Sequence, residues 1–281
     1  WAQVKGAAVS IRFNGTDAAT QIAGTPSVSI DGGAYTAATV WSNGMGTYSV
    51  SMNDGEHTVR IKGTDTAGNA GYSREMHFKA DATVPTLSIT AQPTPASGSV
   101  RITVAAAEDL VAVPIVRVTQ AGTTAVSVSM AAQTGFSRQY IGTYTVLSGF
   151  DGTAVITATG TDMADNGGNV GTNTGSFVAD TTSPTGTVSI NSNAAYTTSL
   201  SVDLSLACSS DVSSVRYRNG TGSWTPWEGA GTVRSFLLDT TGGSGIRSVE
   251  MEMMDAAGNV GTAADTINYD ATTPTGTITI A

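Results

Sequence analysis

The chain has little of what most enzymes and disulfide-rich secreted proteins use. It contains one cysteine, Cys208, which excludes a disulfide framework within the chain. Both histidines, His57 and His77, lie in its first third, so the rest has no imidazole for general-base catalysis. Neither a G-x-S-x-G sequence nor a glycine-rich phosphate loop occurs. These absences favour a non-enzymatic protein.

Charge and long apolar runs are also scarce. Charged residues make up 12% of the 281 residues and the net charge is −9, the wrong sign for a nucleic-acid partner. No apolar run approaches the length of about 18 residues that would predict a membrane span. Hydrophobic residues nevertheless reach 40%, which is enough for packed cores rather than a disordered spacer.

A short sequence motif recurs three times and defines a repeat. The motif has the form D-x-A followed by Asn and Gly residues, and it begins at Asp65, Asp162 and Asp255. A linker motif of the form D-x-T-x-P-T, less regular in its first copy, follows each one and begins at Asp81, Asp180 and Asp270. The spacing predicts three domains, 1–80, 81–179 and 180–270. Residues 271–281 are then either a donor strand or the start of a fourth repeat.

Alternating apolar and polar residues predict an all-β fold. In the third repeat, short period-2 runs separated by turn sequences predict an immunoglobulin-like β-sandwich of seven strands, A to G. In the first repeat, Lys5–Phe13 is predicted as strand B, and nothing before Lys5 is assigned to strand A. Residues 276–280 at the other end have the strand A sequence. The fold prediction is therefore three tandem immunoglobulin-like sandwiches, the first without its own strand A and with a spare one at the C-terminus.

An incomplete sandwich exposes unpaired backbone groups, which favours pairing with another chain. The preferred hypothesis is a structural subunit of an extracellular filament or surface appendage, assembled head to tail from copies of itself. In this hypothesis the C-terminal strand of one subunit completes domain 1 of the next through Thr277, Ile278, Thr279, Ile280, Val9 and Ile11. The alternative is that the sequence is a window on a longer tandem stalk.

The sequences Asp255-Ala256-Ala257-Gly258-Asn259 and Asp270-Ala271-Thr272-Thr273-Pro274 resemble the bacterial immunoglobulin-like (Big-type) tandem repeats of large prokaryotic surface proteins. The resemblance covers the whole chain as repeat architecture and is closest in the third repeat. It implies display on the outside of a prokaryotic cell, a stalk or adhesin role, and calcium at domain junctions.

The junctions offer a geometric argument for calcium. In an immunoglobulin-like sandwich the F–G loop lies at the pole where strand A enters, so each F–G loop should meet the linker that precedes its domain. Carboxylate and amide oxygens are suitable Ca²⁺ ligands. The expected ligand groups are Asp81 with Asp162 and Asn169, Asp180 with Asp255 and Asn259, and Asp65 and Asn69 with Asp270 of a neighbouring subunit. Alternatively, each loop Asp accepts hydrogen bonds from its own loop backbone.

Two further kinds of site are weaker expectations. Trp224 and Trp227, with Tyr217, either form an exposed platform for a sugar or pack at a sheet edge. Asn14 and Asn219 fit the N-glycosylation sequon. A glycan-binding segment of an adhesin or phage fibre, and an accessory region of a secreted enzyme, therefore remain alternatives to the filament.

Overall fold

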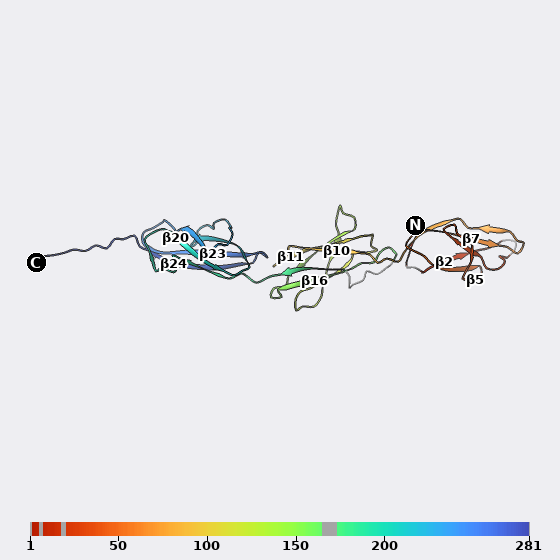
Figure 1. Cartoon of the computed structure of the whole chain (residues 1–281), viewed down its shortest axis with the longest axis horizontal. Helices are drawn as coiled ribbons and strands as arrows, with labels where there is room; N and C mark the ends of the chain where they lie inside the picture. The colour runs from red at the N-terminus through yellow and green to blue at the C-terminus, as the bar shows by residue number, and fades with distance from the viewer. Residues whose placement is uncertain (1, 6–7, 18–20, 165–172, 281) are drawn as a thin grey trace.

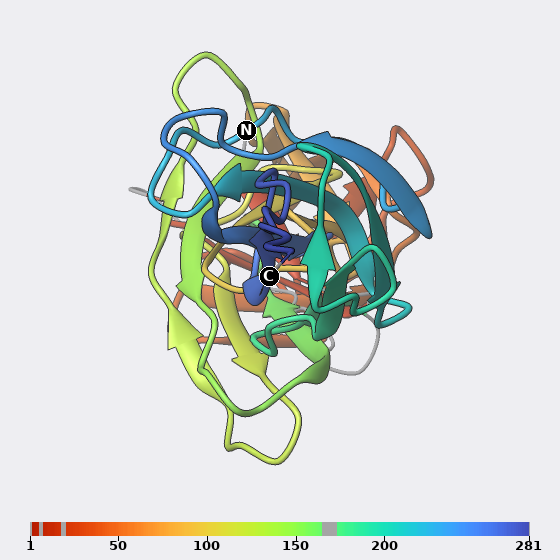
Figure 2. The ribbon, with the colours of Figure 1, turned by 90° about the vertical axis from the view of Figure 1, so that its left-hand side faces the viewer.

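The structure is a computed structural model of the whole chain, and it describes residues 2–5, 8–17, 21–164 and 173–280. Over these residues it consists of β-strands in six sheets, without a helix. Three separate hydrophobic clusters each lie between two sheets, which defines sandwiches 1, 2 and 3 in chain order. The sandwiches follow one another along the long axis (Figure 1), and in the end-on view they overlap (Figure 2). The predicted all-β, tandem immunoglobulin-like fold is confirmed.

Sandwich 1 has one sheet in the order β1-β9-β7-β3-β4, with β8 paired to β7, and a second in the order β2-β6-β5. Its strands are β1 (Ala2–Lys5), β2 (Ala8–Asn14), β3 (Ser27–Ile30), β4 (Thr36–Ala37), β5 (Val40–Ser42), β6 (Met45–Ser51), β7 (Gly55–Thr64), β8 (Ala70–Tyr72) and β9 (Met76–Asp81). Among the described residues its core cluster contains six buried apolar side chains.

The start of sandwich 1 differs from the prediction. The sequence assigned Lys5–Phe13 to one strand, whereas Lys5 ends β1, which pairs in parallel with β9, and strand B is β2. The period-2 pattern missed β1 because four residues are too few to show it, yet they suffice to cover the edge of β9. Among the described residues, β2 pairs only with β6, and its other edge carries no strand.

Sandwich 2 has the sheets β10-β11-β15-β14 and β13-β12-β16-β17. Its strands are β10 (Leu87–Gln92), β11 (Ser99–Ala106), β12 (Ile115–Thr119), β13 (Val126–Val128), β14 (Met130–Ala132), β15 (Gln139–Thr145), β16 (Gly152–Thr159) and β17 (Thr174–Ala179). Strand A of this sandwich, β10, pairs antiparallel with β11 and covers the edge that is open on β2.

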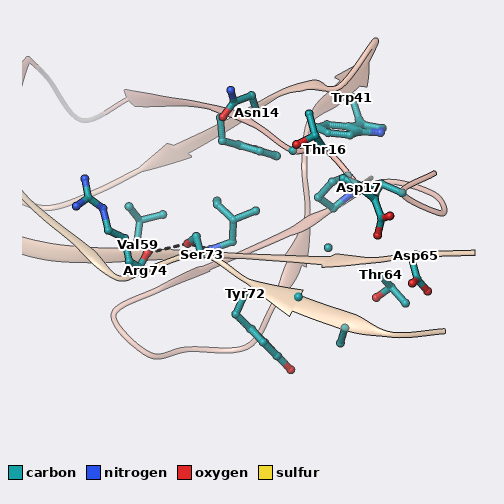
Figure 3. A pocket seen from close by; sticks show the side chains of 18 of the residues that line it. Asn14, Thr16, Asp17, Trp41, Val59, Thr64, Asp65, Tyr72, Ser73 and Arg74 are labelled. Atoms are coloured by element: carbon teal, nitrogen blue, oxygen red, sulfur yellow. Dashed lines mark hydrogen bonds between the residues drawn. The ribbon is translucent and has the colours of Figure 1, made fainter. Parts of the chain in front are cut away.

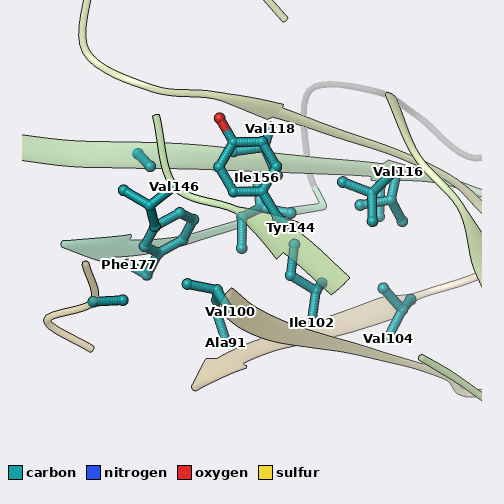
Figure 4. Packing of buried hydrophobic residues seen from close by; sticks show 14 of the residues in the cluster. Ala91, Val100, Ile102, Val104, Val116, Val118, Tyr144, Val146, Ile156 and Phe177 are labelled. Atoms are coloured by element: carbon teal, nitrogen blue, oxygen red, sulfur yellow. The ribbon is translucent and has the colours of Figure 1, made fainter. Parts of the chain in front are cut away.

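Figure 4 shows how the two sheets of sandwich 2 enclose their core. Val100, Ile102 and Val104 alternate along β11 with exposed or half-exposed residues, and all three are fully buried. They face Ile156 on β16 and Phe177 on β17. Because successive side chains of a strand point to opposite faces, this alternation is what places one face of β11 in the core.

Sandwich 3 has the sheets β18-β20-β22 and β19-β24-β23-β21. Its strands are β18 (Gly186–Ile190), β19 (Tyr196–Thr197), β20 (Ser201–Cys208), β21 (Val212–Asn219), β22 (Val233–Leu237), β23 (Gly245–Asp255) and β24 (Val260–Tyr269). Strand A here is β18, which pairs antiparallel with β20. The short β19 was not predicted, since two residues carry no detectable period.

The chain continues past sandwich 3 as an extended tail (Figure 1). Residues 271–280 form no strand and are exposed, with Ile278 at 94% and Ile280 at 93% of their full exposure. No helix in the described part of the chain is long and apolar enough to cross a membrane.

Candidate functional site: the junctions between sandwiches

Each linker is held by a side chain at the end of the sandwich that precedes it. Asp54, directly before the first glycine of β7, accepts hydrogen bonds from the Ala82 backbone N–H (2.7 Å) and the Thr83 hydroxyl. Asp151, directly before the first glycine of β16, accepts from the backbone N–H (2.8 Å) and the hydroxyl (2.7 Å) of Thr181. We call these contacts the linker clamps.

The linker clamps stabilise the ionised form of the Asp54 and Asp151 carboxylates. The Thr83 hydroxyl, followed by the Ala82 N–H, lowers the pKa of Asp54 below its ordinary value. The hydroxyls of Thr182 and Thr181 lower the pKa of Asp151 in the same way. Hydrogen bonds to a charged carboxylate stabilise it relative to the acid, which is the physical cause of both shifts.

Sandwich 3 carries Ser244 at the clamp position, directly before the first glycine of β23. Its hydroxyl accepts a hydrogen bond from the Ala271 backbone N–H (3.1 Å) and donates to the Asp270 carboxylate (3.3 Å). A single hydroxyl makes fewer hydrogen bonds than a carboxylate, so the chain after Asp270 is held more loosely than the two internal linkers.

At the first junction the structure brings Asp81 and Asp162 together, as the sequence predicts, and adds Glu108 to them. One carboxylate oxygen from each of the three lies within 4.8 Å of the others. Asp81 and Asp162 are buried and Glu108 is half-buried. Burial, and then repulsion from Asp81 and Asp162, raises the pKa of Glu108. Asn169, the third predicted ligand, lies outside the described residues.

Sequence reasoning missed Glu108 because it considered only the F–G loop and the linker. Glu108 follows β11 by two residues, in the loop between strands B and C. This loop lies at the same pole as the F–G loop. The signal was therefore available: an acidic residue just after strand B of a repeat whose F–G loop is also acidic.

The second junction is built with a hydrogen-bonded Asn. The Asn259 side-chain N–H₂ donates to the backbone carbonyl of Asp180 (2.8 Å) and to the Asp255 carboxylate (2.8 Å), and its backbone N–H also donates to Asp255 (2.9 Å). The Ser97 hydroxyl of sandwich 2 donates to the Ala257 carbonyl (2.9 Å). Burial raises the pKa of Asp180, and the nearby Asp255 charge adds to that effect.

The two junctions differ at the Glu108 position. Leu87 of β10 pairs with Ala106, and Gly186 of β18 pairs with Cys208, so Ala106 and Cys208 are equivalent. Two residues further on, Ser210 stands where sandwich 2 has Glu108. Among the described residues, three carboxylates lie within 4.8 Å of one another at the first junction only.

The third predicted group is divided between the two ends of the molecule. Asn69 donates its backbone N–H and its side-chain N–H₂ to the Asp65 carboxylate, each at 2.8 Å. Asp270 lies beyond sandwich 3, whereas this loop belongs to sandwich 1, so one chain does not bring them together (Figure 1). The shared hydrogen-bond pattern of Asp65–Asn69 and Asp255–Asn259 explains the motif: Asn closes the loop onto the Asp.

The aromatic residues of sandwich 3 do not form the exposed platform considered from the sequence. Tyr217 is 1% exposed and belongs to the core. Trp224 and Trp227 are half-buried, and the Arg216 guanidinium stacks over both rings, 4.9 and 4.5 Å from their centroids. Arg218 stacks over Trp224 as well, at 4.4 Å. These cation–π contacts occupy ring surface that a sugar would need.

The two sequon asparagines lie in different surroundings. Asn219 donates from its side-chain nitrogen to the Leu237 carbonyl (3.0 Å) and accepts from the Asp239 N–H (3.0 Å), so its amide supports a turn of the sandwich. Asn14 is exposed at the end of β2. Glycosylation of Asn14 stays a prediction.

No protein-family model matches the chain, and no curated protein matches it. Among solved structures, it is similar to a tetra-tandem repeat in the extending region of a large adhesion protein (23% identity over 95% of this chain and 71% of that one, TM-score 0.36). It is also similar to a 1.5-MDa bacterial ice-binding adhesin (16%, 96% and 93%, TM-score 0.48) and a Ca²⁺-stabilized adhesin from an Antarctic bacterium (16%, 95% and 70%, TM-score 0.37).

Proposed function

We propose that this chain is a stiff spacer segment of a prokaryotic extracellular surface protein, and that its function is mechanical rather than catalytic. The observation that carries the proposal is the pair of linker clamps: the connections after sandwiches 1 and 2 are fixed by hydrogen bonds to Asp54 and Asp151. Free linkers behave as flexible coils, whereas clamped linkers fix the angle between neighbouring modules. Fixed modules in series hold whatever they carry at a set distance from their anchor.

A divalent cation, Ca²⁺ in an extracellular setting, completes the first junction in this proposal. Asp81, Glu108 and Asp162 would supply its protein ligands. Burial is the larger cause of the raised pKa of Glu108, and repulsion from Asp81 and Asp162 adds to it; a bound cation would remove that repulsion. Because Asp81 belongs to β9 and the other two to sandwich 2, the ion would bind the two sandwiches to each other.

Small-angle X-ray scattering tests the spacer proposal. The native chain in Ca²⁺ should give the pair-distance distribution of a rod with one well-defined maximum length. The Asp54→Ala/Asp151→Ala variant should give a shorter average length and a broader distribution, while Asp239→Ala, an exposed aspartate in sandwich 3, should change nothing. A native chain that already scatters as a flexible string of modules would contradict the proposal.

A second candidate function is head-to-tail assembly into a filament, in which the tail of one copy completes sandwich 1 of the next. Two observations favour it: the described residues leave one edge of β2 without a strand, and the tail is exposed. The tail is also similar to residues 181–191, which include β18: six of the eleven aligned residues are identical. Sedimentation velocity separates the candidates, because an assembling chain forms species that grow with concentration and a spacer segment does not.

A further inference from the structure

A cavity of about 690 Å³ opens in sandwich 1 beside the unpaired edge of β2 (Figure 3). Apolar side chains from both sheets line it, among them Ile11, Phe13, Trp41, Val59 and Ile61. Sandwiches 2 and 3 have strand A packed at this place. A comparison of the three sandwiches therefore shows what the cavity is shaped to hold.

Strand F is β7 in sandwich 1, β16 in sandwich 2 and β23 in sandwich 3. In each sandwich this strand starts at a glycine and reaches the F–G aspartate ten residues later, so Gly63, Gly160 and Met253 are equivalent. In sandwich 2 a Cβ on Gly160 would meet Leu110 of the B–C loop at 3.0 Å and Leu87 of strand A at 3.6 Å. In sandwich 3 the large residue is on the F strand, and Met253 fills the space beside Gly186 of strand A.

In sandwiches 2 and 3 a large side chain of strand A or of strand F therefore helps to fill this space. In sandwich 1 the described residues include neither a side chain from strand A nor a large side chain on strand F at this position. Gly63 has no side chain, and a Cβ there would meet only Ile22 at 3.9 Å. The space that Leu87 fills in sandwich 2 is part of the cavity, which Gly63 lines.

The linker into sandwich 3 passes close to a glycine that follows the F–G loop. Gly261 follows Asn259 by two residues, as Gly71 follows Asn69. A Cβ on Gly261 would overlap the carbonyl of Pro184, so glycine is needed there for the incoming linker to pass. A Cβ on Gly71 would meet nothing within 4 Å, and Gly71 lines the cavity. Beside Gly71, sandwich 1 therefore has space for a proline carbonyl, and none of the described residues occupies it.

We propose that the cavity and the adjoining segment 13–17 form an acceptor site for one antiparallel strand, residues 274–280 of a second copy of this chain. The proposal rests on the second candidate function and gives it a register. The donor matches strand A of sandwich 3 at Pro274 and Gly276, which correspond to Pro184 and Gly186, and its Ile278 and Ile280 are almost fully exposed in the tail. The donor segment carries no charge, as suits a site with apolar walls.

The register follows from the pairing in sandwich 2. The sequence Gly-Thr-Tyr starts at Gly46 on β6 and at Gly142 on β15, and these glycines pair with Phe13 and Ile102 respectively. Phe13 therefore corresponds to Ile102, which pairs with Ala91 of strand A. Ala91 follows Pro85 by six residues, as Ile280 follows Pro274.

Ile280 of the donor is consequently placed opposite Phe13, Thr279 opposite Asn14 and Ile278 opposite Gly15. This moves the acceptor edge away from Val9 and Ile11, the residues proposed from the sequence. Val9 is 5% exposed in the core and pairs with Val50 on β6. In sandwich 2 the pairing with strand A ends at Arg101, before the position equivalent to Ile11 is reached.

Disulfide trapping in the full chain tests this register. Asn14→Cys with Thr279→Cys, in a Cys208→Ser background, should form intermolecular disulfides, because directly opposed residues have Cα atoms about 4.5–5.5 Å apart. The control pair Arg12→Cys with Thr279→Cys is displaced by two residues and should cross-link far less. Equal trapping of both pairs, preferential trapping of the control pair, or no trapping of either would overturn the proposal.

A peptide experiment tests the occupant. Residues 271–280 lie outside all three cores, so the chain ending at Asp270 keeps its folded sandwiches. A peptide of residues 271–281 should bind it and change the fluorescence of Trp41 in the cavity. Because Gly276 faces Gly63 and leaves space there, a Gly276→Leu peptide should bind about ten- to a hundredfold more tightly. An Ile278→Asp peptide should not bind.

Binding of the Leu peptide without detectable binding of the native one would overturn the tail as the occupant. The peptide result is independent of assembly. A peptide that binds while the full chain sediments as a monomer would leave the acceptor site standing and remove the filament. Concentration-dependent assembly without peptide binding would remove the acceptor site and leave the filament.

Discussion

Replacing Glu108 by Gln should raise the stability of the metal-free protein and lower its stabilisation by Ca²⁺. Two unit charges 4.8 Å apart repel by about 0.9 kcal/mol in water and about 3.5 kcal/mol at an effective dielectric constant of 20. Glu108 is half-buried, and Lys79 and Arg138 offset part of the repulsion. The lower end applies, and Glu108→Gln should stabilise the metal-free protein by about 1 kcal/mol.

Calcium should offset the higher stability of the variant. An ion that binds only the folded state at 100 times its Kd stabilises by about 2.7 kcal/mol, and a site weakened tenfold gains only about 1.4 kcal/mol. Glu108→Gln removes one of three carboxylates, so the variant should be the more stable protein in chelator and lose most or all of that advantage in Ca²⁺. For a domain of this size 1 kcal/mol corresponds to about 4–8 °C in Tm.

Differential scanning calorimetry in EDTA and in Ca²⁺ measures both effects on the transition of sandwich 2. Glu56→Gln is the matched control, because it makes the same chemical change at an exposed residue of β7. A variant that is less stable than the native protein in EDTA, or a Ca²⁺ shift equal in both proteins, would refute the reasoning.

The depressed pKa values of Asp54 and Asp151 mean that the clamps are present above the ordinary Asp pKa of 3.8 and lost as pH falls through the folded values, so scattering should show the rod loosening only in acid. His57 is hydrogen-bonded to the Asp31 carboxylate and the Asn53 carbonyl, and these two acceptors raise the pKa of His57 above 6.5. Nuclear magnetic resonance titration should show the raised pKa, and Asp31→Asn should lower it again. The stability that the His57 contacts contribute should be lost as pH rises through the folded-state pKa. The buried Gln120 amide is hydrogen-bonded to Tyr144, Leu147 and Phe150. In urea unfolding, Gln120→Ala should lower the free energy of unfolding by about 3 kcal/mol and Tyr144→Phe by about 1 kcal/mol, and equal losses would contradict this account.

The repeat and its strands could be predicted because each depends on local pattern. Strands β20, β21 and β23 have clear period-2 alternation, and all three belong to the sandwich that this alternation predicts for the third repeat. The short strands β1 and β19 could not be predicted. These strands have four and two residues, and they form because β1 pairs with the edge of β9 and β19 with the edge of β24.

The candidate site was predictable in part. The meeting of Asp81 with Asp162 follows from topology alone, because strand A enters at the F–G pole. Glu108 required the B–C loop to be considered too. Reflection of the sequence about the first F–G loop predicts a cross-strand pair of His57 and His77, and the structure differs by one residue. His57 pairs with Phe78 and Thr58 with His77, which places the imidazoles on opposite faces.

The loop asparagines show a different limit. The sequence identifies Asn69 and Asn259 as residues of special importance, but it does not say which end of the amide matters. In the structure the nitrogen of each side chain closes the loop onto an Asp carboxylate. Whether an amide serves as a donor or a ligand depends on how the loop closes in three dimensions, which residue type alone does not contain.

The stiffness of the first linker is the central claim, and a distance measurement tests it most directly. Spin labels at Ser51→Cys in sandwich 1 and Ser99→Cys in sandwich 2, both exposed, would be measured by double electron–electron resonance in a Cys208→Ser background. The account predicts one narrow distance distribution in the native chain, broadened by Asp54→Ala. A distribution that is already broad in the native chain, with Ca²⁺ present, would contradict it.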